Sequence, residues 1–224
     1  MTIKKHKPII LNPNLDEDYH VHSLNFSDGM NTVDEMVQYA GKIGLKKLTF
    51  ADHSQIGTRK CLSYRNFIKT WKNVHNDVEI DFTVEADLIN KEGDVCASIR
   101  GVESEKFLLS FHPWQYLDEL DTTTEAFCKA IKRYKDRIIC IAHIHSQKNK
   151  DIFDIKKIIK VANEYDVPLE LNGNYLRDEF ALEQARILCE NANKILINSD
   201  AHHLAHLRDC RQKAMDFLKE NGFV

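Results

Sequence analysis

Short apolar runs alternate with stretches of helical periodicity along nearly the whole chain of 224 residues. Runs rich in apolar and β-branched residues predict seven strands, at residues 18–22, 46–51, 80–89, 106–111, 137–142, 167–171 and 194–198. Apolar residues at three- and four-residue spacing predict helices in most of the intervals and after the last strand, at residues 31–44, 63–76, 122–136, 151–166, 178–193 and 207–222. Helices that alternate with strands are the crossover connections of a parallel sheet. The sequence therefore predicts one α/β domain with a barrel-like closed sheet rather than two small domains.

The chain outside this alternation is short. Residues 1–15 contain lysines but no apolar core of a signal peptide, and we interpret them as an N-terminal arm before a barrel domain at 16–224. Residues 90–105 are poor in helical pattern and predict a hairpin. No apolar run approaches the ~20 residues that span a bilayer, and a net charge of −3 provides no broad surface for nucleic acid or anionic lipid. We therefore expect a cytoplasmic protein without membrane or nucleic-acid partners.

Histidines and carboxylates collect at the C-terminal ends of the predicted strands, where β/α barrels carry their chemistry. In chain order these residues are His20 and His22, Asp52 and His53, Glu85, His112, His143 and His145, Glu170, and Asp200 with His202. His20 and His22 are separated by one residue, so their side chains point to the same face of a strand. This distribution indicates a metal site.

Imidazole and carboxylate ligands suit zinc, manganese and iron(II). The candidates outnumber the four ligands of one tetrahedral ion, and a carboxylate such as Glu85 can bridge two ions. The ligand count therefore predicts a multinuclear centre. Two ions ~3.5–4 Å apart stabilise the attacking and leaving oxygens in phosphatases and nucleases.

The ordered motifs HVH, SDG, ADH, VEAD, SFH, IAH and NSDAH resemble the PHP (polymerase and histidinol phosphatase) family over roughly residues 16–210. The resemblance implies a distorted (β/α)7 barrel, hydrolysis of phosphate esters, and two or three divalent transition-metal ions of zinc, manganese or iron. It implies nine metal ligands: His20, His22, Asp28, His53, Glu85, His112, His143, Asp200 and His202.

By the same resemblance these ligands form three sets. The sets are His20, His22, Glu85 and Asp200; Glu85, His112 and His143; and His53, His202 and Asp28, which stands where some members of the family carry a histidine. We expect Asp18 and Asp52 to orient imidazoles from behind. A metal-bound water is expected to attack phosphorus in line, with Glu85 and Asp200 as electrostatic and bridging carboxylates, so no side-chain nucleophile is required.

Basic and aromatic residues near the strand ends are candidates for binding the substrate. Arg177, Arg59 and Arg208 follow the sixth, second and seventh strands and suit a phosphate group. Trp114 stacks on a substrate ring or covers the barrel mouth, and His145 is a further candidate contact. The sequence around Trp114 and the short chain differ from typical histidinol phosphatases. We therefore expect a small-molecule phosphate monoester, with histidinol phosphate of histidine biosynthesis as one candidate.

Two alternative functions come from different classes. An amidohydrolase-type barrel also begins with an HxH strand and acts on C–N bonds, but the ADH and DAH motifs here favour the PHP resemblance. A non-catalytic PHP module, of the kind that serves a polymerase, is expected to have lost ligands, whereas this ligand set is complete.

Overall fold

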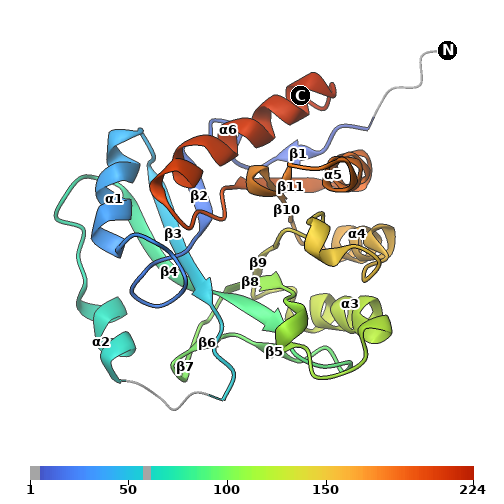
Figure 1. Ribbon diagram of the computed structural model, residues 1–224, viewed down its shortest axis with the longest axis horizontal. Coiled ribbons are helices and arrows are strands. Elements are labelled where there is room, and N and C mark those ends of the chain that lie inside the picture. Colours follow the sequence, from blue (N-terminus) through green and yellow to red (C-terminus); the bar gives the residue numbers. More distant parts are fainter. Residues whose placement is uncertain (1–5, 58–61) are drawn as a thin grey trace.

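The computed structural model describes residues 6–57 and 62–224 of the chain. Its main feature is a nine-stranded sheet in the order β1-β11-β10-β9-β8-β4-β3-β2, with β5 paired to β4. All pairs along this order are parallel, and the sheet curls into a distorted (β/α)7 barrel (Figure 1). The seven barrel strands are β2 (Glu17–Val21), β3 (Lys47–His53), β4 (Glu79–Leu88), β8 (Phe107–Ser110), β9 (Ile138–Ile141), β10 (Leu169–Asn172) and β11 (Lys194–Asn198). The predicted fold class is confirmed.

The two ends of the curled sheet meet at a seam between β2 and the end of β11. Val21 pairs with Ala201 through an isolated parallel bridge. Lower on the seam, the side-chain amide of Asn12 donates to the Ile197 carbonyl at 2.7 Å, accepts from the Ile197 N–H at 2.9 Å, and donates to the Glu17 carbonyl at 3.2 Å. A side chain thus satisfies backbone groups that a regular strand pair would otherwise satisfy.

Several helices begin where the sequence supplies a capping side chain. Thr32 accepts from the N–H of Glu35, whose carboxylate accepts from the Thr32 N–H in return. Asp154 and Asp178 cap the fourth and fifth helices by accepting the backbone N–H groups of Lys157 and Ala181. The helices are α1 (Val33–Lys42), α2 (Leu62–Thr70), α3 (Thr123–Tyr134), α4 (Ile155–Glu164), α5 (Glu179–Asn191) and α6 (Leu204–Glu220).

Helix α2 ends earlier than the sequence pattern predicts, at Thr70 rather than near residue 76. The side chain of Asn73 accepts from the N–H groups of His75 and Asn76 at 3.0 and 3.3 Å. Asn76 in turn donates to the Val37 carbonyl at 2.9 Å. These local side-chain bonds offer the backbone an alternative to the helix and stop it there.

The predicted hairpin within 90–105 is present. Strands β6 (Ser98–Ile99) and β7 (Val102–Glu103) pair antiparallel across Arg100 and Gly101, whose φ angles are 49° and 70°. Two positive φ angles define the turn that matches the twist of a two-residue hairpin. The neighbouring β5 (Val95–Cys96) adds to β4 in antiparallel orientation.

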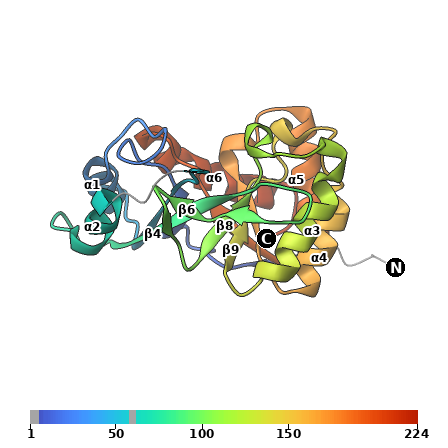
Figure 2. The same cartoon turned by 90° about the horizontal axis from the view of Figure 1, so that it is seen from below.

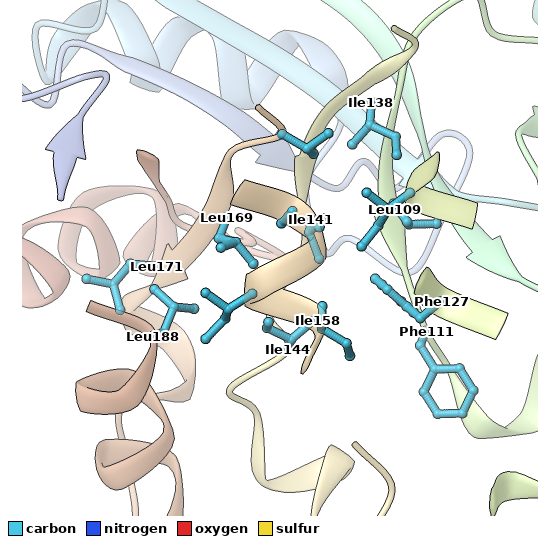
Figure 3. Packing of buried hydrophobic residues seen from close by; sticks show 14 of the residues in the cluster. Leu109, Phe111, Phe127, Ile138, Ile141, Ile144, Ile158, Leu169, Leu171 and Leu188 are labelled. Atoms are coloured by element: carbon cyan, nitrogen blue, oxygen red, sulfur yellow. The ribbon is translucent and has the colours of Figure 1, made fainter. Parts of the chain in front are cut away.

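Helices cover the outside of the curled sheet. Helices α3, α4 and α5 lie on one side and α1 and α2 on the other (Figures 1 and 2). The larger core joins Phe127, Ile158 and Leu188 of the first group to strand residues such as Leu109 (Figure 3). Under α1, Met36 belongs to a second core with Phe50 of β3. The apolar residues of the strands are buried against the helices on the outer face of the sheet, so polar residues can occupy the strand ends that face inward.

The predicted arm contributes a short strand of its own. Strand β1 (Ile9–Ile10) pairs parallel to β11 at the edge of the sheet. The division of the chain at residue 15 stays a prediction. Within 6–57 and 62–224, no helix combines the length and apolar character needed to cross a bilayer.

Candidate metal centre

The C-terminal ends of the barrel strands bring all nine predicted metal ligands together. They form four overlapping groups, and within each group the ligand atoms lie within 4.8 Å of one another. The groups are His20, His22 and Glu85; His20, His143 and Asp200; His53, Glu85 and His112; and His22, Asp28, His53 and His202. The sets differ in detail from those that the family resemblance implies, because His143 groups with Asp200 and His53 groups with His112. How the nine residues divide among ions stays a prediction.

Glu85 lies at the centre of this cluster. It is fully buried on β4, and its two oxygens face different imidazoles. Oε1 lies 2.6 Å from His143 Nε2, and Oε2 lies 2.7 Å from His53 Nδ1. The imidazole nitrogens within 3.8 Å of these oxygens belong to His20, His22, His53, His112 and His143. One carboxylate therefore touches several ligand groups at once.

His20, His22 and Asp200 meet across the barrel seam. The ring centroids of His20 and His22 lie 5.1 Å apart, as the same-face spacing predicts. Asp200 Oδ1 is 2.9 Å from His22 Nε2 and 3.5 Å from His20 Nε2. Asp200 follows β11, so closure of the sheet brings this carboxylate to the first strand of the barrel.

Asp28 lies at the open side of the cluster. Its Oδ1 is 3.2 Å from His202 Nε2 and 3.4 Å from His53 Nε2. Ser27 supports this corner, since its hydroxyl donates to Asp28 at 3.1 Å and accepts the backbone N–H of His53 at 3.2 Å. The SDG motif therefore brings a carboxylate to two of the predicted imidazole ligands.

The charges of the cluster suit bound cations. Burial works to raise the pKa of Glu85, but the facing imidazoles, His53 first, hold it well below its usual range. Burial works to lower the pKa of His53, yet the charges of Glu85 and Asp28 raise it to about 11. Burial lowers the pKa of His22 to about 4, so that this imidazole is neutral, as a metal ligand must be. Ionised carboxylates here require nearby positive charge, which protons or divalent cations can supply.

The donor atoms of the cluster fit metal ions. Four of its buried atoms form no well-oriented hydrogen bond, although other polar atoms of the cluster lie close to them: His20 Nε2, His22 Nε2, Glu85 Oε2 and Asp200 Oδ1. Buried polar atoms are otherwise almost always paired. Nitrogen and carboxylate oxygen are the ligands that zinc, manganese and iron accept. These four atoms come from three separate segments and point into one cluster, which is the arrangement that a coordinated ion satisfies.

Two buried carboxylates orient imidazoles from behind. Glu170 Oε1 lies 2.8 Å from His20 Nδ1, and Asp87 Oδ1 lies 2.5 Å from His112 Nδ1. Each contact holds the Nδ1 side of its ring and leaves Nε2 toward the cluster. Both residues carry a signal in the sequence, because Asp87 lies two residues after Glu85 on the same strand face and Glu170 lies in the sixth predicted strand.

The prediction that Asp18 and Asp52 orient imidazoles is wrong. Asp52 accepts the N–H and the hydroxyl of Ser23, at 2.6 and 2.8 Å. Asp18 accepts the backbone N–H groups of His20 and Ser199, both at 3.2 Å. Both carboxylates hold loop and strand backbone rather than ring nitrogens.

Tyr175 is a residue of the centre that the sequence analysis missed. Its hydroxyl donates to Asp200 Oδ2 at 2.8 Å, and its ring lies 5.2 Å from that of His143. The short 3-10 helix Gly173–Tyr175 carries it over the cluster. Gly173 permits this placement, because a Cβ there would lie 1.9 Å from the carbonyl oxygen of Cys210 on α6. No periodicity or motif marks this position.

The backbone at two proposed ligands adopts an unusual conformation. His143 and Asp200 have φ angles of 27° and 49°. Positive φ is uncommon for residues with a Cβ and is found at functional sites that the surrounding fold holds in place. These two residues therefore owe their placement to the surrounding structure rather than to local preference.

Two of the predicted substrate-binding residues lie at the rim. Trp114 is 69% exposed, and its ring lies 4.8 Å from the ring of His112. Arg177 is exposed and donates a hydrogen bond to Asn174 in the loop that carries Tyr175. Both remain available to a molecule that approaches the cluster.

The other predicted substrate-binding residues are placed differently. His145 is fully buried, with Nε2 3.2 Å from the Asn172 carbonyl, so it presents no surface to a substrate. Arg208 is exposed on α6, and its guanidinium donates two bonds to Asp209 at 2.6 and 2.8 Å. Arg59 lies outside the described residues.

Curated proteins of similar sequence are named as phosphatases. A probable phosphatase of Caldicellulosiruptor saccharolyticus is 26% identical over 211 residues, which cover 88% of this chain and 84% of that protein. A probable phosphatase of Proteus mirabilis is 24% identical, covering 92% of this chain and 86% of that protein. A DNA polymerase/3'-5' exonuclease of Bacillus subtilis is 24% identical over 87% of this chain but only 35% of its own length.

A solved structure shares the fold. Histidinol phosphate phosphatase from Lactococcus lactis, complexed with zinc, L-histidinol and phosphate, superposes with a TM-score of 0.59 at 13% identity and covers 93% of this chain and 94% of that one. The family model of the PHP domain matches residues 18–202, a span that includes all nine residues of the cluster. The chain therefore belongs to the PHP domain family.

Proposed function

We propose that this protein hydrolyses phosphate monoesters of small molecules with two or three divalent ions of zinc, manganese or iron. Family membership and the relatives named as probable phosphatases support a metal-dependent phosphoesterase. The structural neighbour was solved with L-histidinol and phosphate. Histidinol phosphate is therefore the first substrate to test.

The observation that carries this proposal is the buried cluster around Glu85. A structural role alone does not explain a fully buried carboxylate that faces several imidazoles, beside atoms of His20, His22 and Asp200 that form no well-oriented hydrogen bond. Burial of such a set is unfavourable unless charge and hydrogen-bonding needs are met. Divalent ions meet both needs.

The residues of the cluster have separable roles in this reaction. Bound divalent ions would neutralise the phosphate oxygens and lower the pKa of an attacking water toward ~7. Glu85, whose two oxygens face different imidazoles, and Asp200, which lies at the seam, would help to hold these ions. Tyr175 bonds to Oδ2 of Asp200, which leaves Oδ1 facing His20 and His22. At the rim, Arg177 is proposed to bind the phosphate and Trp114 the organic group.

A substrate screen tests the proposal. Protein purified without chelator is analysed for metals, stripped, and reconstituted separately with zinc, manganese and iron(II). It is then assayed on histidinol phosphate and on sugar, amino-alcohol and nucleotide monophosphates. We expect two or three metal equivalents and metal-dependent release of phosphate from at least one monoester. Less than one equivalent after reconstitution, or no phosphate release by metal-loaded protein, would contradict the proposal.

The same preparation tests the alternative functions. Hydrolysis of a hydantoin or lactone without hydrolysis of p-nitrophenyl phosphate would indicate an amidohydrolase. Retention on an oligonucleotide column without hydrolysis of any monoester would indicate a nucleic-acid module. The proposed function predicts the opposite result in both assays.

A further inference from the structure

We propose that Arg211, on the last helix, is a positioning residue that sets the spacing of His20 and Asp200 across the barrel seam by way of Asp18. The inference rests on the proposed function, since His20 and Asp200 are proposed ligands of the same metal centre. Arg211 itself touches no ligand side chain in the contacts of the described residues. Its action is therefore indirect.

The contact between Arg211 and Asp18 is deeply buried. Arg211 is 5% exposed, Asp18 is fully buried, and Arg211 Nη1 donates to Asp18 Oδ2 at 2.6 Å. A buried, charge-assisted hydrogen bond of this kind holds the oxygen that accepts it in place. Helix α6 thus holds Oδ2 of Asp18 through Arg211.

The second oxygen of Asp18 connects both sides of the seam. Oδ1 accepts the backbone N–H of His20 on β2 and the backbone N–H of Ser199, the residue before Asp200, both at 3.2 Å. One carboxylate therefore joins β2, the end of β11 and α6. If the carboxylate of Asp18 rotates, the backbone N–H groups of His20 and Ser199 lose their shared acceptor.

The link through Asp18 has its largest effect on ligand spacing at the seam. Toward the C-terminal end of β2, an isolated bridge between Val21 and Ala201 joins the two sides of the seam, and β2 and β11 form no regular ladder in the sheet of the described residues. His20 Nε2 and Asp200 Oδ1 are 3.5 Å apart across this seam. Metal affinity depends on ligand geometry, and loss of a partner behind the ligands typically weakens it by ~10- to 100-fold. A purely structural ion pair would stabilise the fold without this effect on metal affinity.

Zinc binding by Arg211→Met and Arg211→Lys tests the inference. Stripped protein is titrated with zinc in competition with a chelator, and the melting temperature of the stripped protein is measured in parallel. We expect Arg211→Met to bind zinc ~10- to 100-fold more weakly at the tightest site, and Arg211→Lys to recover part of that loss. Arg186→Met, which removes an exposed arginine from α5, is the control and is expected to bind zinc as the wild type does. Wild-type zinc affinity in a less thermostable Arg211→Met protein would overturn the inference.

Asp18→Asn provides a second test if Arg211→Met does not fold. The amide has the same shape but only one acceptor oxygen, so it cannot serve both Arg211 and the two N–H groups. We expect a loss of zinc affinity similar to that of Arg211→Met, and wild-type affinity in Asp18→Asn would refute the proposed role. Because zinc affinity is measured without any substrate, the result does not depend on phosphatase activity. A wild-type protein that binds no metal would instead refute the metal centre itself, and this inference with it.

Discussion

Replacement of Glu85 by glutamine tests the centre of the proposed site most directly. The side chain keeps its size but loses its charge and one of its two acceptor oxygens. In the structure, Oε1 faces His143 and Oε2 faces His53, at 2.6 and 2.7 Å. Whichever way the amide turns, its NH₂ group points toward one of these two sides. At an effective dielectric constant near 20, a unit charge ~4 Å from another contributes ~4 kcal/mol. That is ~10³-fold in an equilibrium constant, so we expect at least ~10²-fold weaker binding of one ion and a similar loss of turnover.

The assay measures metal equivalents and turnover on the same sample. Stripped Glu85→Gln protein is reconstituted with the metal that best supports the wild type, dialysed, analysed for bound metal and assayed. Glu183→Gln removes an exposed carboxylate from α5 and serves as the matched control. We expect at least one metal equivalent fewer in Glu85→Gln and no change in the control. Wild-type stoichiometry together with wild-type turnover would refute the reasoning that Glu85 bridges ions.

Three further predictions concern single residues of the centre. His22→Ala should lose metal and phosphatase activity with little change in melting temperature; retained activity in the folded, metal-loaded variant would contradict a ligand role. Tyr175→Phe removes the hydroxyl that bonds Asp200, and we expect ~10-fold lower turnover with metal content unchanged; equal turnover would show that this bond does not matter. The pKa of His53 is raised to about 11 from 6.5. The stabilisation of the fold by protonated His53 is therefore complete below pH 6.5 and is lost as the pH rises toward 11. The melting temperature of stripped protein should therefore fall between pH 7 and 10. Metal-loaded protein needs neutral imidazole and should not show that fall; a flat profile for the stripped protein would contradict the prediction.

The sequence alone is sufficient to predict the barrel and the convergence of its strand ends. Seven apolar runs separated by amphipathic helices admit few arrangements other than a parallel sheet, and such a sheet brings its strand ends to one face. Residues as distant in the chain as His20 and Asp200 could therefore be expected to meet. The early end of α2 was missed because Asn73 competes for the backbone locally, an effect that apolar periodicity does not register.

The carboxylates behind the ligands were harder to predict. Asp18 and Asp52 lie two residues and one residue before ligand histidines in the sequence, but Glu170 and Asp87 are the residues that face imidazole rings. Which carboxylate meets a ring depends on strand register, and β2 shifts its register against β3 between Asp18 and Val21. Adjacency in the chain carries no information about such a shift.

Tyr175 and Arg211 depend on features that no strand or helix period encodes. Tyr175 reaches Asp200 because the loop after β10 packs against the backbone of α6, where Gly173 leaves room for Cys210. Arg211 lies on a helix that reads as an ordinary amphipathic segment. Its partner becomes apparent only when that helix is placed against the seam.

The positive φ angles of His143 and Asp200 put backbone strain at two proposed metal ligands. Left-handed backbone costs ~1–2 kcal/mol for a residue with a Cβ, so glycine at either position would relieve strain. Asp200→Gly would also remove a buried carboxylate, and the resulting protein would lack a proposed ligand. It would also lose the bond from Tyr175 and the contacts with His20 and His22, so relief of backbone strain alone does not favour glycine at this position. The packing that holds both conformations also limits how far either ligand can move, so a bound ion has less ordering left to impose on these two residues.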